Sequence, residues 1–136
     1  MIHKKTVLHI SFILLLANIY SCKKTPGYGG NATIKGTFWA RNYDVYRSYV
    51  TGRYPAVNTT VYLFFGDDVS PGTSATTNSI GEFEFKYLRK GKYKVVAYSK
   101  QRQSTASTPN VFPVEHIVDI TKRMEVKNIG LDTLDQ

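Results

Sequence analysis

The chain has 136 residues, ten tyrosines, one cysteine and a formal net charge of +8 at pH 7. This length is enough for one domain around one hydrophobic core. The single cysteine, Cys22, excludes an intramolecular disulfide, so packing must hold the domain together.

The first 21 residues have the order of a secretory signal. Two lysines at positions 4 and 5 precede an apolar run over residues 7–19, and the small Ser21 stands directly before Cys22. The apolar run has about 13 residues, whereas a membrane-spanning helix needs roughly 20. The pattern therefore favours a cleaved signal peptide over an uncleaved membrane anchor.

The end of this segment points to a lipid anchor. The sequence Ile19-Tyr20-Ser21-Cys22 resembles a lipobox, the site at which a lipoprotein signal peptidase cuts before a lipidated cysteine. Tyr20 is bulkier than the residue usual at that position. The resemblance implies a lipoprotein signal peptide over residues 1–21 and fatty acylation, palmitate included, at Cys22. An ordinary secretory signal is the alternative.

The residues after Cys22 indicate which membrane holds the anchor. Lys23 and Lys24 follow the cysteine, with no acidic residue and no acidic run. By resemblance to other lipoproteins, this disfavours both retention in the inner membrane and export to the surface. We expect a bacterial cell-envelope protein anchored in the outer membrane, on the periplasmic leaflet. Nucleic acid is not an expected partner.

The rest of the chain is patterned as strands. Residues 22–31 are rich in Gly and Lys and predict a flexible tether. From residue 32 to residue 136 we expect one domain, in which no stretch of 11 or more residues has helical spacing. Seven short strands are predicted, over residues 32–40, 57–65, 73–78, 82–88, 92–99, 112–120 and 124–131.

Alternation within these strands predicts which side chains are buried. The core set is Ile34, Val61, Leu63, Phe83, Phe85, Tyr93, Val95 and Val118. Glu82, Glu84, Lys92 and Lys94 are expected in solvent. Tyr87, Phe112 and His116 are in phase with the buried positions, and a change of phase near Asn128 indicates a bulge. One dry and one wet face per sheet is typical of an antiparallel β-sandwich.

Three segments resemble one family. They are residues 34–38 (IKGTF), 55–63 (PAVNTTVYL) and 76–95 (TTNSIGEFEFKYLRKGKYKV). Together they resemble the carboxypeptidase regulatory-like domain, a transthyretin-like (prealbumin-like) β-sandwich. The resemblance implies an all-β, seven-stranded antiparallel sandwich of Greek-key type. Gly81 would turn the chain before the buried Phe83, and the Tyr93 hydroxyl would reach a backbone partner at the sheet corner.

The sequence offers little for catalysis. His116 is the one histidine after the signal segment, and its phase indicates a core or rim residue rather than a general base. No serine stands in a nucleophile-elbow context. Asp67 and Asp68 lie in a Gly- and Pro-containing stretch that predicts a turn rather than a calcium site. We expect a non-catalytic protein with no cofactor and no metal.

The candidate interaction surface lies within residues 38–54, where aromatic residues alternate with arginines. Its members are Trp39, Arg41, Tyr43, Tyr46, Arg47, Tyr49, Arg53 and Tyr54. Tyrosine, tryptophan and arginine are favoured at protein interfaces, and aromatic faces also stack on sugar rings. The segment is expected to form either a hairpin extension or a loop. The leading hypothesis is a structural or protein-interaction module; the alternative is a carbohydrate-binding accessory lipoprotein.

A second feature is basic. Lys86, Arg89, Lys90, Lys92 and Lys94 lie close together along the chain. The cluster is either a solvated face or a surface for anionic lipid headgroups or lipopolysaccharide.

Overall fold

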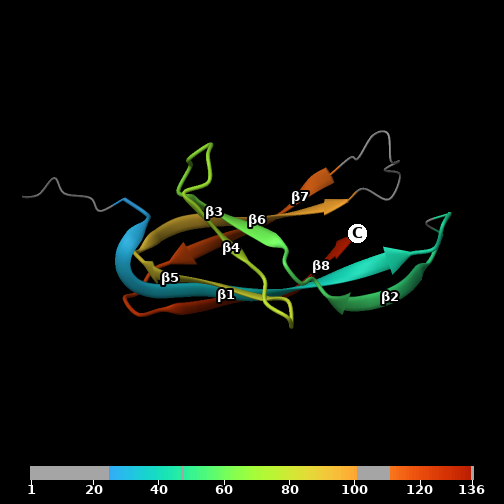
Figure 1. Ribbon diagram of the computed structural model, residues 1–136. Coiled ribbons are helices and arrows are strands. Elements are labelled where there is room, and N and C mark those ends of the chain that lie inside the picture. Colours follow the sequence, from blue (N-terminus) through green and yellow to red (C-terminus); the bar gives the residue numbers. More distant parts are fainter. Residues whose placement is uncertain (1–24, 47, 101–110, 136) are drawn as a thin grey trace, which may run out of the picture.

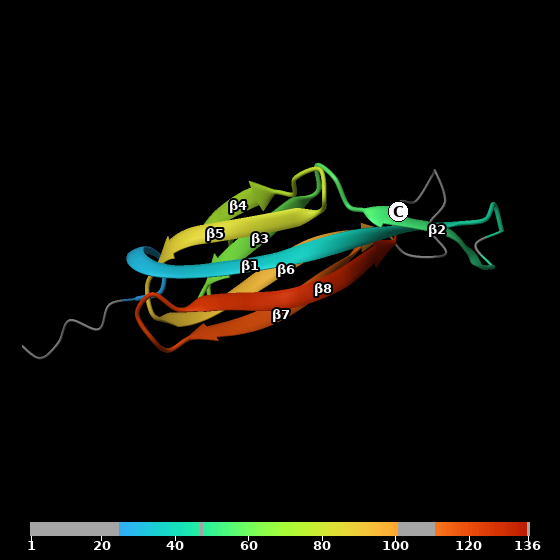
Figure 2. The same cartoon turned by 90° about the horizontal axis from the view of Figure 1, so that it is seen from below.

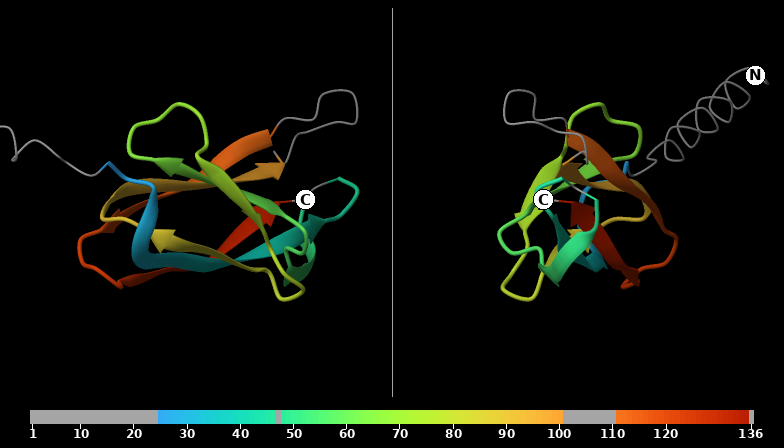
Figure 3. Two further views of the ribbon diagram at one scale, coloured as in Figure 1. Left: turned by 60° about the vertical axis from the view of Figure 1, so that its left-hand side comes forward. Right: turned by 90° about the vertical axis from the view of Figure 1, so that its right-hand side faces the viewer.

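The computed structural model describes residues 25–46, 48–100 and 111–135, so Cys22 and Arg47 lie outside the described residues. The described residues form eight strands and no helix, and hence no helix that could cross a membrane. The strands are Tyr28–Tyr43 (β1), Val50–Pro55 (β2), Thr60–Phe65 (β3), Thr73–Thr76 (β4), Glu82–Leu88 (β5), Gly91–Lys100 (β6), Val111–Ile120 (β7) and Val126–Asp135 (β8). They pack as two facing sheets (Figures 1 and 3).

The strand β1 organises the first sheet. It pairs with β5 along its first part and with β2 along its last part, while β8 runs parallel to it on the other edge (Figure 2). The second sheet has the order β4-β3-β6-β7, with antiparallel pairs throughout. The expected all-β sandwich is confirmed. The expected seven antiparallel strands are wrong on two points, because β2 adds an eighth strand and β8 is parallel to β1.

The core matches the predicted register. Every member of the predicted core set is buried. The ring of Phe83 stacks on Phe38 at 5.4 Å between centroids and meets the edge of Phe85 at 5.7 Å. On the opposite faces Glu82 and Glu84 are exposed, as is Lys92, while Lys94 is half-buried over the ring of Phe64. Alternation alone therefore assigns the inner face of β5 correctly up to Phe85.

Two inward assignments are wrong. Tyr87 is 68% exposed because its φ of 61° interrupts the alternation, and Leu88 is buried in its place. At this point two residues of β5, Lys86 and Tyr87, lie opposite the single residue Thr33 of β1, which is a bulge. Phe112 is also exposed, and His116 is half-buried, because β7 is an edge strand.

The bulge expected near Asn128 is confirmed. Asn128 pairs with Lys35 and Leu131 pairs with Thr37, so β8 has one residue more than β1 between these pairs. Gly81 also has its predicted role. Its φ is +79°, and a Cβ there would lie 2.3 Å from the carbonyl oxygen of Phe38. The turn before β5 therefore requires glycine.

The Tyr93 hydroxyl fastens the start of the chain to the fold. The ring is fully buried, and the hydroxyl accepts a hydrogen bond from the Gly27 amide at 2.9 Å and donates one to the Arg89 carbonyl at 2.8 Å. The Arg89 amide in turn donates to the Gly27 carbonyl at 2.8 Å. Burial raises the pKa of Tyr93. The expected contact of this hydroxyl with the backbone is therefore confirmed, and residues 28–31, assigned to the tether by sequence, begin β1.

Truncation of Phe85 tests the core register. Phe85→Ala should lower the free energy of unfolding by about 3–5 kcal/mol, because it empties a fully enclosed site. Glu84→Ala removes only an exposed pair with Lys86 (2.9 Å) and should cost about 0–1 kcal/mol. Thermal denaturation of both variants measures the difference, and equal melting temperatures would contradict the register.

Candidate interaction surface

The segment 41–55 is a hairpin extension of the first sheet. The last pair between β1 and β5 is Thr37 with Glu82, the first residue of β5. Beyond it, β1 pairs with β2, Trp39 opposite Pro55 and Arg41 opposite Arg53. Figures 1 and 2 show this hairpin projecting at the end of the molecule opposite to the start of β1. The alternative that the sequence left open, an irregular loop, is wrong.

Asp44 organises the tip of the hairpin. Its carboxylate accepts hydrogen bonds from the amides of Tyr49 (3.0 Å), Tyr46 (3.3 Å) and Ser48. These amides, that of Tyr49 first, lower the pKa of Asp44. The turn leaves three apolar side chains in solvent, with exposed fractions of 94% for Val45, 88% for Tyr46 and 66% for Tyr49. The fold therefore places an apolar, aromatic tip at its far end.

The predicted surface is divided between two faces and the tip. Trp39, Arg41 and Tyr43 alternate along β1 and share the outer face of the first sheet with Arg53. The opposite face of the hairpin carries Tyr54, whose hydroxyl donates to the Asn42 side chain at 3.0 Å. Tyr46 and Tyr49 lie at the tip, and Arg47 is outside the described residues. The structure therefore does not gather the predicted residues on one surface.

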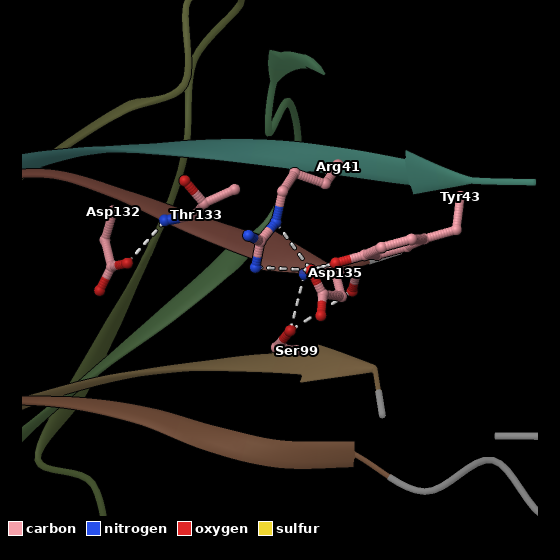
Figure 4. Close-up of polar contacts among 6 residues, drawn as sticks. All are labelled: Arg41, Tyr43, Ser99, Asp132, Thr133 and Asp135. Atoms are coloured by element: carbon pink, nitrogen blue, oxygen red, sulfur yellow. Dashed lines mark hydrogen bonds and ion pairs between the residues drawn. The ribbon is translucent and has the colours of Figure 1, made fainter. Parts of the chain in front are cut away.

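Two of these residues bind the end of the chain. Arg41 reaches Asp135 Oδ1 through Nε (2.9 Å) and Nη2 (2.8 Å), and the Tyr43 hydroxyl donates to the same oxygen at 3.2 Å (Figure 4). The Asp135 amide donates to Ser99 Oγ on β6 at 2.7 Å. Asp135 is buried. Its carboxylate joins β8 to β1, and its amide joins β8 to the second sheet. Arg41 therefore has a structural role rather than a ligand-binding one.

The sequence carries no local signal for Asp135. It lies 94 positions from Arg41, and only the parallel pairing of β8 with β1 brings the two together. A charged residue at the end of an alternating strand gives no indication of which partner it will meet.

The histidine has a structural partner. His116 Nε2 lies 2.7 Å from Asp132 Oδ2, and this contact joins β7 to β8 across the two sheets. Asp67 and Asp68 are exposed in the turn that follows β3. Among the described residues, no group of three or more His, Cys, Asp or Glu side chains could hold a metal ion.

Comparisons with known proteins give structural matches only. No family model matches the chain, and a comparison with curated proteins finds no match. The chain is similar to the crystal structure of a candidate carbohydrate-binding protein of Pseudomonas aeruginosa, with 18% identity, a TM-score of 0.47, and coverage of 83% of this chain and 92% of the other. It is also similar to (S)-allantoin synthase, with 11% identity, a TM-score of 0.40, and coverage of 76% of this chain and 42% of the other.

Replacing Arg41 tests its structural role. Arg41→Met leaves the buried carboxylate of Asp135 without its cation and should cost on the order of 2–3 kcal/mol, below the roughly 3–5 kcal/mol of a fully buried pair because Arg41 is partly exposed. Arg53→Met, directly opposite on β2, removes an exposed charge and should change stability by less than about 0.5 kcal/mol. Urea denaturation compares the two. If the Arg41→Met variant were as stable as the parent, the structural role of Arg41 would be contradicted, and Arg41 would again be a candidate ligand-binding residue.

Proposed function

We propose that the protein is a lipid-anchored, non-catalytic module of the bacterial cell envelope with a structural or protein-interaction role. The observation that carries the proposal is the opposite placement of the two ends of β1. The chain enters the fold at one end, and the hairpin exposes its aromatic tip at the other (Figure 1). A membrane anchor at the first end would hold the tip away from the membrane.

The proposed anchor is Cys22, in the outer membrane and on its periplasmic leaflet. The stretch from Cys22 to Thr25 can span at most about 11 Å, given roughly 3.6 Å for each residue. Gly27 is bound to Tyr93 and Arg89, so an acyl chain on Cys22 would keep this end of the sandwich close to the lipid surface.

The proposed partner surface is the tip of the hairpin. The start of β1 curls, since Tyr28 and Ala32 both pair with Leu88, but the 11 steps from Ala32 to Tyr43 rise by about 3.3 Å each and place the tip roughly 36 Å from the anchored end. Tyr46 and Tyr49 present large, exposed, amphipathic rings there, a residue type enriched among the side chains that dominate protein interfaces. An envelope protein is therefore the proposed partner.

Carbohydrate binding is the second candidate. Trp39 is half-buried on the outer face of the first sheet and shares that face with the exposed Arg53. A partly exposed indole ring beside a hydrogen-bond donor suits stacking against a sugar. This candidate uses the flat face of β1 and β2 rather than the tip.

We also propose membership of the carboxypeptidase regulatory-like family for residues 32–136. Support comes from the two-sheet fold and from where the resembling segments lie. Residues 34–38 fall in β1, residues 55–63 lead into β3, and residues 76–95 contain β5 and the start of β6.

Blocking lipidation tests the anchor. Cys22→Ala should leave a larger, uncut and unlipidated precursor, because the peptidase requires the acylated cysteine. Globomycin, which blocks the peptidase itself, should leave a larger, uncut precursor that still carries lipid. Immunoblotting and labelling with a palmitate analogue measure both effects. Maturation to the same size with and without Cys22 would contradict the lipoprotein assignment.

Crosslinking from the tip tests the partner surface. A photoreactive phenylalanine analogue in place of Tyr46 should give a discrete protein adduct in cells, and the same analogue in place of the exposed Tyr98 on the second sheet should not. Adding Tyr49→Ala should reduce the adduct several-fold without changing the melting temperature. Adducts of equal yield from both positions would contradict the proposal, while a sugar-dependent change in Trp39 emission would favour carbohydrate binding.

A further inference from the structure

A basic cavity lies where the chain enters the fold. It has a volume of about 450 Å³ and is lined by Gly29, Gly30, Arg89, Lys90, Lys122 and Arg123, among others. The residues come from the start of β1, the connection between β5 and β6, and the turn between β7 and β8. Figures 1 and 2 show these three segments at the same end of the molecule.

The two glycines let the start of β1 lie directly against Leu88 and Arg89. A Cβ at Gly30 would lie 2.0 Å from the Leu88 carbonyl oxygen, and one at Gly29 would lie 2.8 Å from Nη2 of Arg89. The Arg89 guanidinium therefore lies across bare backbone. The hydrogen bonds between Gly27, Tyr93 and Arg89 hold the two segments together, so the cavity is built by the fold and is not a chance gap between loops.

Two further cations come from the β7–β8 turn, which Glu125 stabilises. The Glu125 carboxylate accepts hydrogen bonds from the amides of Lys122 (3.1 Å) and Thr121 (2.8 Å) and pairs with Lys127 at 3.1 Å. These contacts, the Lys122 amide first, lower the pKa of Glu125 to about 2. Glu125 thus holds the turn that presents Lys122 and Arg123 while its charge is balanced by Lys127.

The charge of the cavity is otherwise unbalanced. None of the four lining cations forms an ion pair with a carboxylate of the described residues. Glu125, which lies in the same turn, is paired with Lys127, and Asp67 and Asp68 line a separate hollow beside Pro26 and Lys92. An anion is the ligand that would complete the site.

Exposed apolar side chains flank the cations. Tyr87 precedes Leu88 and Arg89 and is 68% exposed, and Met124 follows Arg123 and is 73% exposed. Both have positive φ, so the backbone turns each side chain away from the core. Cations beside exposed apolar and aromatic groups suit the boundary between lipid headgroups and acyl chains.

We propose that this cavity binds the phosphate of an anionic lipid headgroup in the membrane that carries the anchor, and so fixes the orientation of the domain. The proposal rests on the proposed lipid anchor at Cys22. Two arguments favour a lipid over a free phosphate. The cavity adjoins the segment that leads to Cys22, and the exposed Tyr87 and Met124 lie next in the chain to residues that line it.

Titration of the full chain in nonionic micelles tests the site. Short-chain phosphatidylglycerol should shift the amide resonances of Gly29, Gly30 and Lys122, whereas short-chain phosphatidylcholine and inorganic phosphate should not. Arg89→Gln with Lys122→Gln should weaken binding by about 30-fold, since each basic residue near a lipid surface contributes on the order of a fivefold change. Lys90→Gln with Arg123→Gln removes two exposed cations and should act similarly.

The control removes the same charge elsewhere. Lys35→Gln with Arg53→Gln, both exposed and outside the cavity, should leave binding unchanged. Equal weakening in control and cavity variants would reduce the effect to net charge and overturn the proposal. Inorganic phosphate bound as tightly as phosphatidylglycerol would overturn the choice of a lipid. Because the titration does not depend on acylation of Cys22, it can fail independently of the processing experiment.

Discussion

The contact between the Tyr93 hydroxyl and the backbone of Gly27 fixes where the first strand begins. The hydroxyl is buried, and it is satisfied only because the incoming chain and the β5–β6 connection both lie within hydrogen-bond distance. A buried donor left without a partner costs about 1–3 kcal/mol, so any fold that lacks this contact would be less stable by about that amount. Since β2, β5 and β8 all pair with β1, the position of this strand determines the first sheet.

The two ends of β1 then acquire different properties. At the first end, the Tyr93 contact lays Gly29 and Gly30 against Arg89 and opens a basic cavity. At the far end, the ion pair of the partly exposed Arg41 with the buried Asp135 holds β8 against β1, and β1 continues into a hairpin with exposed tyrosines. A single long strand thus links the proposed membrane-facing end to the proposed partner-facing end.

Local patterns predict much of this fold. Alternation in residues 82–86 and 92–95 assigns the core correctly, because these stretches bury every second side chain, but Val96 is also buried although it faces the other way. Alternation fails at Tyr87, where a bulge changes the phase, and at β2, where Gly52, Pro55 and mostly exposed positions give no strand signal. These features depend on pairing with β1, which no local window contains.

The residues of the candidate sites can also be predicted only in part from local sequence. The aromatic and basic residues of the hairpin are recognisable by type, but their division between two faces depends on the register of β1 with β2. Arg89 and Lys90 form a visible basic cluster along the chain. Lys122 and Arg123 join them only because the β7–β8 turn lies beside the β5–β6 connection, which is a property of topology.

The central claim is that the basic end of the sandwich lies on the membrane and the hairpin tip lies farthest from it. Paramagnetic relaxation in lipid nanodiscs measures this directly, using the acylated chain, phosphatidylglycerol and a lipid with a gadolinium-chelating headgroup. The account predicts strong relaxation of the Gly29 and Lys122 amides and little or none at Tyr49, roughly 36 Å away by the length of β1 from Ala32 to Tyr43. Equal relaxation at both ends, or stronger relaxation at Tyr49, would contradict it.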